Sequence, residues 1–154
     1  MDVSQFTSPQ TIYTDSDYRF EITIPQGIVI TLVTDYLKDD DDGQCRTLVG
    51  CEENENIQVG IEYLSRPSYS SAEEYVSAMA AIVESNGYSC QTATVTSADE
   101  TVGYYFYADF GDNAFSINCI FPINETEYIN VWYGFTDEAY FEEVITSLES
   151  FSWS

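Results

Sequence analysis

The side chains most capable of chemistry gather in residues 35–58, DYLKDDDDGQCRTLVGCEENENIQ. Carboxylates bind divalent metals, and pairs of cysteines either exchange electrons or form disulfides. The segment contains four consecutive aspartates and two of the four cysteines, namely Asp39, Asp40, Asp41, Asp42, Cys45 and Cys51. Its composition is compatible with a metal-binding loop, a redox site or an acidic hairpin held by a disulfide.

The spacing of the two cysteines argues against a redox motif. Cys45 and Cys51 have five residues between them, which matches neither a C-x-x-C motif nor a zinc knuckle. A zinc site that uses all four cysteines of the chain stays an alternative.

Calcium is the metal that the aspartate run suits best. An EF-hand loop needs Asp at position 1, Gly at position 6 and Glu at position 12. With Gly43 at position 6, Lys38 falls at position 1 and Val49 at position 12, so both ends fail. An irregular cluster that adds Glu52 or Glu53 remains a rival hypothesis, and a solvated hairpin tip is the favoured interpretation.

The chain contains no histidine, which excludes serine and cysteine triads and imidazole acid-base chemistry. A hydrolase with two carboxylates is an alternative, but 27 acidic residues without a motif single out no pair. We therefore expect no enzyme and no cofactor.

Four cysteines in a small acidic chain predict disulfides and an oxidising compartment. Three pairings are possible. We favour Cys45 with Cys51, because the two are local, and Cys90 with Cys119, because they lie on strands that a meander brings near each other. Four reduced, buried thiols are the alternative.

The net charge of −23 restricts the partners. Affinity for phosphate comes from Lys and Arg, so nucleic acid and anionic lipid are disfavoured. The basic residues are few and scattered, namely Arg19, Lys38, Arg46 and Arg66. The acidity serves solubility or attracts a cationic partner.

Hydrophobic periodicity predicts the α+β class. Alternating residues indicate strands at 18–24, 28–36 and 57–64, of which the first two form a hairpin or consecutive strands, and four strands in a meander at 88–135. Helical stripes mark 72–83, which includes Ile82 and is capped by Ser70 or Ser71, and the segment after the expected N-cap Thr136. We expect one antiparallel sheet of about six or seven strands, packed by two helices in a single domain of residues 12–154, after a flexible leader of residues 1–11.

Aromatic residues of the meander form a candidate contact surface. Along the second strand of the meander, Tyr105 and Tyr107 point away from Tyr104 and Phe106. Exposed Tyr and Trp suit a protein or carbohydrate contact, and the candidates are Tyr105, Tyr107, Tyr128 and Trp132. The alternative is that they pack beneath the 35–58 segment or the other helix.

Three local patterns resemble the PsbP-like fold: FEITIP ending at Pro25, the helix opening SSAEEYVSAM, and the terminal FEEVITSLESFSW. This fold is shared by an extrinsic photosystem II protein, a eukaryotic Ran-binding protein and many bacterial secreted or lipoprotein domains. The resemblance covers about residues 12–153. It implies an antiparallel sheet between helices and a role in binding macromolecules without catalysis, and it transfers no functional residue.

The sequence thus predicts a non-catalytic binding domain of an extracytoplasmic bacterial secreted protein or lipoprotein, at the cell surface or secreted. Its partner is a protein or a cell-envelope component, and the domain is expected to be a monomer or a weak dimer. No apolar run is long enough to span a membrane. Either the protein is cytosolic or an export signal was removed before residue 1. We favour removal, because of the cysteines and because the leader is polar and rich in Ser and Thr.

Overall fold

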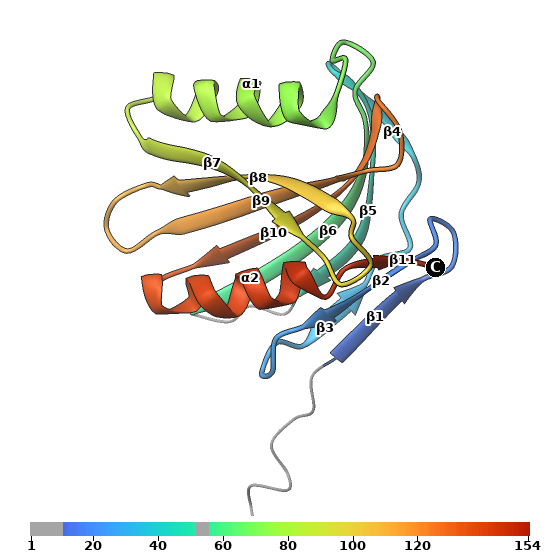
Figure 1. Cartoon of the computed structure of the whole chain (residues 1–154), viewed down its shortest axis with the longest axis horizontal. Coiled ribbons are helices and arrows are strands. Elements are labelled where there is room, and N and C mark those ends of the chain that lie inside the picture. Colours follow the sequence, from blue (N-terminus) through green and yellow to red (C-terminus); the bar gives the residue numbers. More distant parts are fainter. Residues whose placement is uncertain (1–10, 52–55) are drawn as a thin grey trace, which may run out of the picture.

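Two antiparallel sheets and two α-helices make up the computed structural model, which describes residues 11–51 and 56–154. The larger sheet has eight strands in the order β3-β5-β6-β10-β9-β8-β7, with β4 paired to β5, and the smaller sheet has the order β1-β2-β11. Helix α1 lies against one face of the large sheet, and the small sheet and α2 lie against the other (Figure 1). The elements are β1 (Thr11–Asp15), β2 (Phe20–Ile24), β3 (Ile30–Leu32), β4 (Lys38–Asp40), β5 (Gly43–Cys51), β6 (Ile57–Ser65), α1 (Ala72–Ser85), β7 (Ser89–Thr96), β8 (Val102–Asp109), β9 (Phe115–Pro122), β10 (Glu127–Phe135), the 3-10 helix η2 (Glu138–Tyr140), α2 (Phe141–Glu149) and β11 (Ser152–Trp153).

The predicted α+β class and the order of strands, helix, meander and helix are confirmed. Strands β7 to β10 pair as consecutive antiparallel neighbours. Polar residues and glycine form the turns between these strands, and Glu100, Asp112 and Asn113 adopt positive φ there. The expected count of six or seven strands is too low, because a second sheet was not foreseen.

Helix α1 begins as its sequence indicates. The side chain of Ser71 accepts a hydrogen bond from the backbone N–H of Glu74 at 3.1 Å, which satisfies one of the free donors of the first turn. The helix ends at Asn86, followed by Gly87 with φ of +89°. Ile82 was assigned to the buried stripe, but its side chain is 52% exposed.

The N-terminal strands pair differently from the predicted hairpin. Strand β2 pairs with β1 on one side and β11 on the other, whereas β3 pairs with β5 in the large sheet. The two predicted strands are therefore consecutive in the chain but belong to different sheets. Strand β1 was not predicted, and its first residue, Thr11, was assigned to the leader, whose residues 1–10 lie outside the described residues.

The C-terminal segment is not a single helix but a 3-10 turn, an α-helix and a short strand. Asp137, and not Thr136, caps the 3-10 turn η2 by accepting a hydrogen bond from the N–H of Ala139 at 2.9 Å. Helix α2 then ends at Glu149, and residues 152–153 pair with β2 as a short strand.

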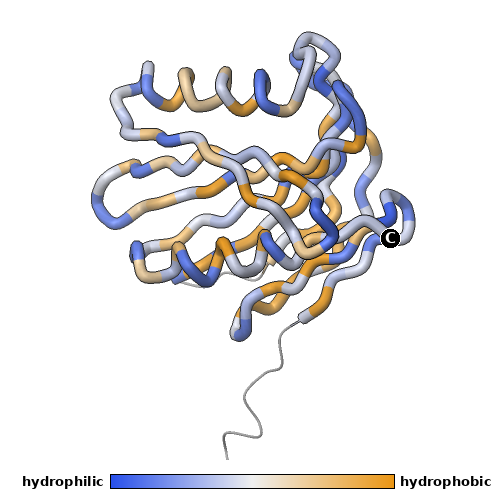
Figure 2. Tube along the Cα trace, in the orientation of Figure 1, coloured by the Kyte–Doolittle hydropathy of each residue, from blue (hydrophilic) through white to orange (hydrophobic). Residues whose placement is uncertain are grey.

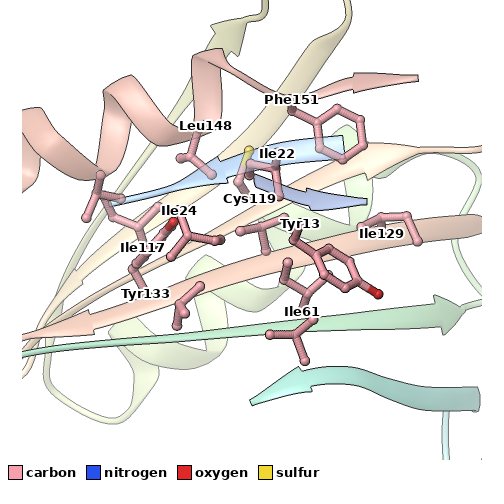
Figure 3. Close-up of a cluster of buried hydrophobic side chains, with 14 of the residues drawn as sticks. Tyr13, Ile22, Ile24, Ile61, Ile117, Cys119, Ile129, Tyr133, Leu148 and Phe151 are labelled. Carbon is pink, nitrogen blue, oxygen red and sulfur yellow. The ribbon is translucent and has the colours of Figure 1, made fainter. Parts of the chain in front are cut away.

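Most buried side chains lie between the two sheets. Figure 3 shows part of this inner core, with Ile22 and Ile24 of β2 facing Ile117 and Ile129 of the large sheet. A smaller cluster lies between α1 and the opposite face of the large sheet, around Tyr128. Figure 2 shows hydrophobic positions along the strands and inner helix faces, and hydrophilic ones in turns.

Hydroxyl groups connect α2 and the residue after it to both sheets. The hydroxyl of Ser147 donates to the carbonyl of Thr23 at 2.7 Å and lies 2.5 Å from the hydroxyl of Tyr133. The hydroxyl of Ser150 accepts from the N–H of Thr23 at 2.8 Å. These bonds satisfy polar groups that burial of the helix would otherwise leave without partners.

Phe151 ties the C-terminus into the inner core. Its ring stacks on Phe121 of the large sheet with centroids 3.8 Å apart and on Phe20 of the small sheet at 5.2 Å. All three side chains are fully buried.

We predict that Phe151→Ala lowers the free energy of unfolding by about 3–5 kcal/mol, because it leaves a cavity between the sheets. Phe110→Ala is the matched control, because Phe110 is 39% exposed, and it should cost less than about 1 kcal/mol. Urea denaturation of both variants measures the difference. Equal losses would contradict a central role for the Phe151 stack.

A second prediction concerns Asp99, in the turn between β7 and β8. Burial acts to raise the pKa of Asp99, but hydrogen bonds from Ser97, Thr101 and the N–H of Trp153 outweigh it and lower this pKa to about 2. The unfolded value is about 3.9, so this stabilisation is complete above about pH 4 and is lost as the pH falls toward 2.

The Asp99→Asn variant should lack this pH-dependent stabilisation. We expect the difference in melting temperature between the native protein and the variant to shrink as the pH falls from 5 to 2. Asp109→Asn provides the control for removing one charge from a neighbouring turn. A difference that stays constant over this range would disprove the assigned pKa.

Candidate binding surfaces

Both predicted disulfides are wrong, because the strands keep the cysteines apart. Cys45 and Cys51 lie at opposite ends of the single strand β5, about 20 Å apart at about 3.3 Å per residue. A disulfide requires Cα atoms within about 7 Å. Cys90 lies on β7 and Cys119 on β9, with β8 between them. All four cysteines are free.

The two cysteines of the meander also face opposite sides of the sheet. Cys119 is fully buried in the inner core, whereas Cys90 packs in the cluster beneath α1. Burial raises the pKa of both thiols, that of Cys119 well above its usual value, and it also raises the pKa of Cys45. Neutral thiols are weak nucleophiles, and Cys45, Cys90 and Cys119 instead pack in the two hydrophobic clusters. The prediction of an oxidising compartment loses this support.

The aspartate run forms an acidic hairpin without the disulfide. Strand β4 pairs with the start of β5, so that Asp40 lies opposite Gly43. The hairpin is fixed by Arg66, which is 8% exposed and donates to the carboxylate of Asp40 and to the carbonyls of Gln44 and Ser65 at 3.0–3.1 Å. Burial opposes ionisation of Asp40, but the N–H of Asp42 and the guanidinium of Arg66 lower its pKa.

The structure gives no support to a metal centre in this hairpin. Asp39 accepts from the amide of Gln44 at 3.1 Å, and Asp40 is engaged by Arg66. Across residues 11–51 and 56–154, no three Asp, Glu or Cys side chains come together as a metal site. Glu52 and Glu53, which the irregular cluster would add, lie outside the described residues.

The four aromatic candidates do not form one surface. Tyr105 and Tyr107 face the inner core, and Tyr107 stacks on Phe141 of α2 at 4.9 Å, so the alternative of packing under the second helix is confirmed for Tyr107. Tyr128 is fully buried beneath α1, and its hydroxyl donates to the carbonyl of Glu125 at 2.6 Å. Trp132 is partly exposed on the α1 side of β10.

A groove between the two sheets was not predicted. Strand β1 is the outer strand of the small sheet, and β3 is the outer strand of the large sheet. A hollow of about 500 Å³ lies between them, lined by Ile12, Tyr13, Thr14, Ile30 and Leu32. Figure 1 shows β1 and β3 at the same end of the molecule.

The rim of this groove carries exposed apolar side chains. The side chain of Ile12 is 63% exposed, that of Leu32 is 69% exposed and that of nearby Val29 is 59% exposed. Each of β1 and β3 also has one edge without a strand partner among the described residues. The alternation TIYTD is the sequence signal for β1, but nothing in the sequence indicates that β1 lies beside β3.

The sheet order and the helices on its two faces define the class: an α+β domain with a PsbP-like fold. The chain is similar to the solution structure of cyanobacterial PsbP (CyanoP) from Synechocystis sp. PCC 6803, with a TM-score of 0.58 and 12% sequence identity. The match covers 96% of this chain and 94% of that one. The expected PsbP-like fold is therefore confirmed.

The other comparisons give no relative. No family model matches the chain, and no curated protein matches its sequence. No helix in the described part of the chain is long and apolar enough to cross a membrane.

Proposed function

We propose that this domain is a non-catalytic binding module of an extracytoplasmic bacterial protein, and that it binds an extended segment of a basic partner protein in the groove between β1 and β3. The observation that carries this proposal is the meeting of two unpaired strand edges across one apolar hollow. An added strand can hydrogen-bond to such an edge while its alternate side chains enter the hollow.

The exposed side chains define what the partner brings. Apolar side chains of a partner can cover Ile12 and Leu32 and so remove their apolar surface from water. The bound segment therefore carries apolar residues at alternate positions, on the side that faces the hollow. Edge strands in monomeric proteins usually carry charges or proline that prevent pairing, whereas β3 has neither and β1 has only Asp15, whose side chain is buried. These strands are therefore better suited to pairing with a partner than to lying exposed to solvent.

The charge of the chain indicates a basic partner. The chain has 27 acidic and four basic residues, and three of the four basic residues pair locally: Lys38 with Asp35, Arg46 with Asp17 and Arg66 with Asp40. The remaining acidic residues attract a positively charged partner over long range and repel a second copy of this chain.

Catalysis by paired carboxylates finds no support in the electrostatics. A general acid in such an enzyme needs a carboxyl group whose pKa is raised. The carboxyl groups with a displaced pKa in the described residues, Asp35, Asp40, Asp99 and Glu127, are all displaced downward. They serve as hydrogen-bond acceptors and ion-pair partners.

A peptide that alternates lysine and valine tests the groove, with an alternating glutamate and valine peptide as the control. We expect the lysine peptide to bind and to slow amide hydrogen exchange in β1 and β3, as measured by NMR. Binding should weaken as salt is added, because the attraction is screened. Protection at other strands would place the interface elsewhere.

Ile12→Asn should weaken this peptide about tenfold, because one apolar contact of about 1.4 kcal/mol is lost. Ile123→Asn is the matched control, because Ile123 is 41% exposed in the turn between β9 and β10 and should not affect binding. Equal affinities of the two variants would refute the groove as the binding site.

The extracytoplasmic location is a separate part of the proposal. It rests on the likeness of the FEITIP strand and the two helices to secreted and lipoprotein domains. Fractionation of cells that express the native gene measures it: we expect the protein in the envelope or the medium. Recovery in the cytoplasm would contradict the location and leave the groove untouched.

A further inference from the structure

Helix α1 leaves part of its sheet face uncovered. The helix packs along β7, β8 and β9, and its first turns reach Tyr128 at one end of β10. Further along the same face, the ladder places Trp132 beside Gly60 and Asn118, and Asn130 beside Glu62. Trp132, Glu62 and Asn118 are all partly exposed, so solvent reaches this part of the sheet face.

The indole of Trp132 lies over the backbone of Gly60. A Cβ atom at position 60 would be 2.2 Å from Nε1, 2.4 Å from Cε2 and 2.7 Å from Cζ2 of the ring. These atoms lie along the edge of the indole that carries the N–H group, so this edge of the ring covers the glycine. A side chain at position 60 would push the indole away. The indole is partly exposed, so it can also contact a ligand.

Asn130 contributes a buried acceptor without a donor. Its side chain is 5% exposed, and its Nδ2 donates to Oε1 of Glu62 at 2.9 Å and to Oδ1 of Asn118 at 3.3 Å. Its Oδ1 receives no hydrogen bond from the described residues. Rotating the amide by 180° would turn this oxygen toward two other acceptors, so its neighbours fix the orientation.

An unsatisfied buried carbonyl destabilises a fold, so this oxygen calls for a donor that the described residues do not supply. Glu62 is also without a cationic partner, because the ion pairs of the described residues involve Asp35, Asp17 and Asp40. A ligand that carries both positive charge and N–H groups would satisfy Glu62 and Asn130 together. Since Glu62 and Asn118 are partly exposed, their side chains can turn to admit it.

We propose that Trp132, Glu62 and Asn130 form a binding site for a primary ammonium group. The ammonium lies against a face of the indole, where the ring quadrupole attracts a cation. Its charge is neutralised by Glu62, and one of its N–H groups is accepted by Oδ1 of Asn130. A lysine side chain and a free polyamine both carry this chemistry.

This site is independent of the groove between β1 and β3. It lies on the α1 side of the large sheet, whereas Ile12 and Leu32 border the hollow between the sheets. A failure to bind peptide in the groove would therefore not contradict the ammonium site. A failure to bind ammonium compounds would likewise not contradict the groove.

The test is a titration of the full chain with N-acetyl-lysine methylamide, spermidine and methyl glucoside, followed by NMR. We expect the two ammonium compounds to shift the indole N–H resonance of Trp132 and the amide resonance of Asn130, and to leave that of Trp153 in place. A response to the lysine derivative alone would identify a side chain as the ligand, and a stronger response to spermidine would identify a polyamine. A response to methyl glucoside without either amine would overturn the proposal in favour of a sugar site.

Two variants separate a specific site from general attraction to an acidic protein. Glu62→Gln should weaken binding at least about fivefold, since a partly desolvated charge pair is lost. Glu142→Gln removes the same charge from the exposed face of α2 and should change affinity less than about twofold. Equal effects of the two variants would overturn the proposal.

Gly60→Ala tests the ring position, because the added methyl displaces the indole, and it should abolish the shift at Trp132. Circular dichroism checks that this variant is folded. If it does not fold, the comparison of Glu62→Gln with Glu142→Gln still decides the proposal. A folded Gly60→Ala protein with full affinity would contradict the role of the indole.

Discussion

The stacking of Phe151 between Phe121 and Phe20 is the contact on which the arrangement of the two sheets depends. Phe20 belongs to the small sheet, Phe121 to the large sheet, and Phe151 to the segment after α2, so one stack joins three parts of the chain. The hydrogen bonds of Ser147 and Ser150 to Thr23 then set the position of α2 along β2. Once β2 is held in this way, its neighbour β1 lies beside β3 and the groove follows.

The fold was largely predictable because the helices and the longer strands each carry a local signal. Ser71 before a stripe of apolar residues marks α1, and the turns around Asp112 and Asn124 separate strands with alternating side chains. Such signals depend only on residues that are near in sequence, so they can be recognised without knowledge of the tertiary structure. The pairing of β2 with β1 and β11 was not predictable, because a short strand gives no indication of its partner.

The candidate sites were less predictable, since they depend on distances across the sheets. The cysteine pairs looked plausible in sequence, yet an extended β5 places Cys45 and Cys51 at its two ends. Tyr128 and Trp132 share one face of β10, but α1 covers the first and leaves the second partly exposed. Which part of a sheet a helix covers depends on the angle and position at which the helix crosses the strands. The periodicity of the helix or of a strand does not encode either.

The pairing of β11 with β2 has a consequence for the synthesis of the protein. Phe151 and Trp153, which cover Phe20 of β2, are separated from that strand by nearly the whole domain. The small sheet therefore cannot close on the ribosome until synthesis has passed β11. Until then the apolar side chains of β2 stay accessible, so a chaperone that binds unfolded chains has the whole intervening period of elongation in which to act.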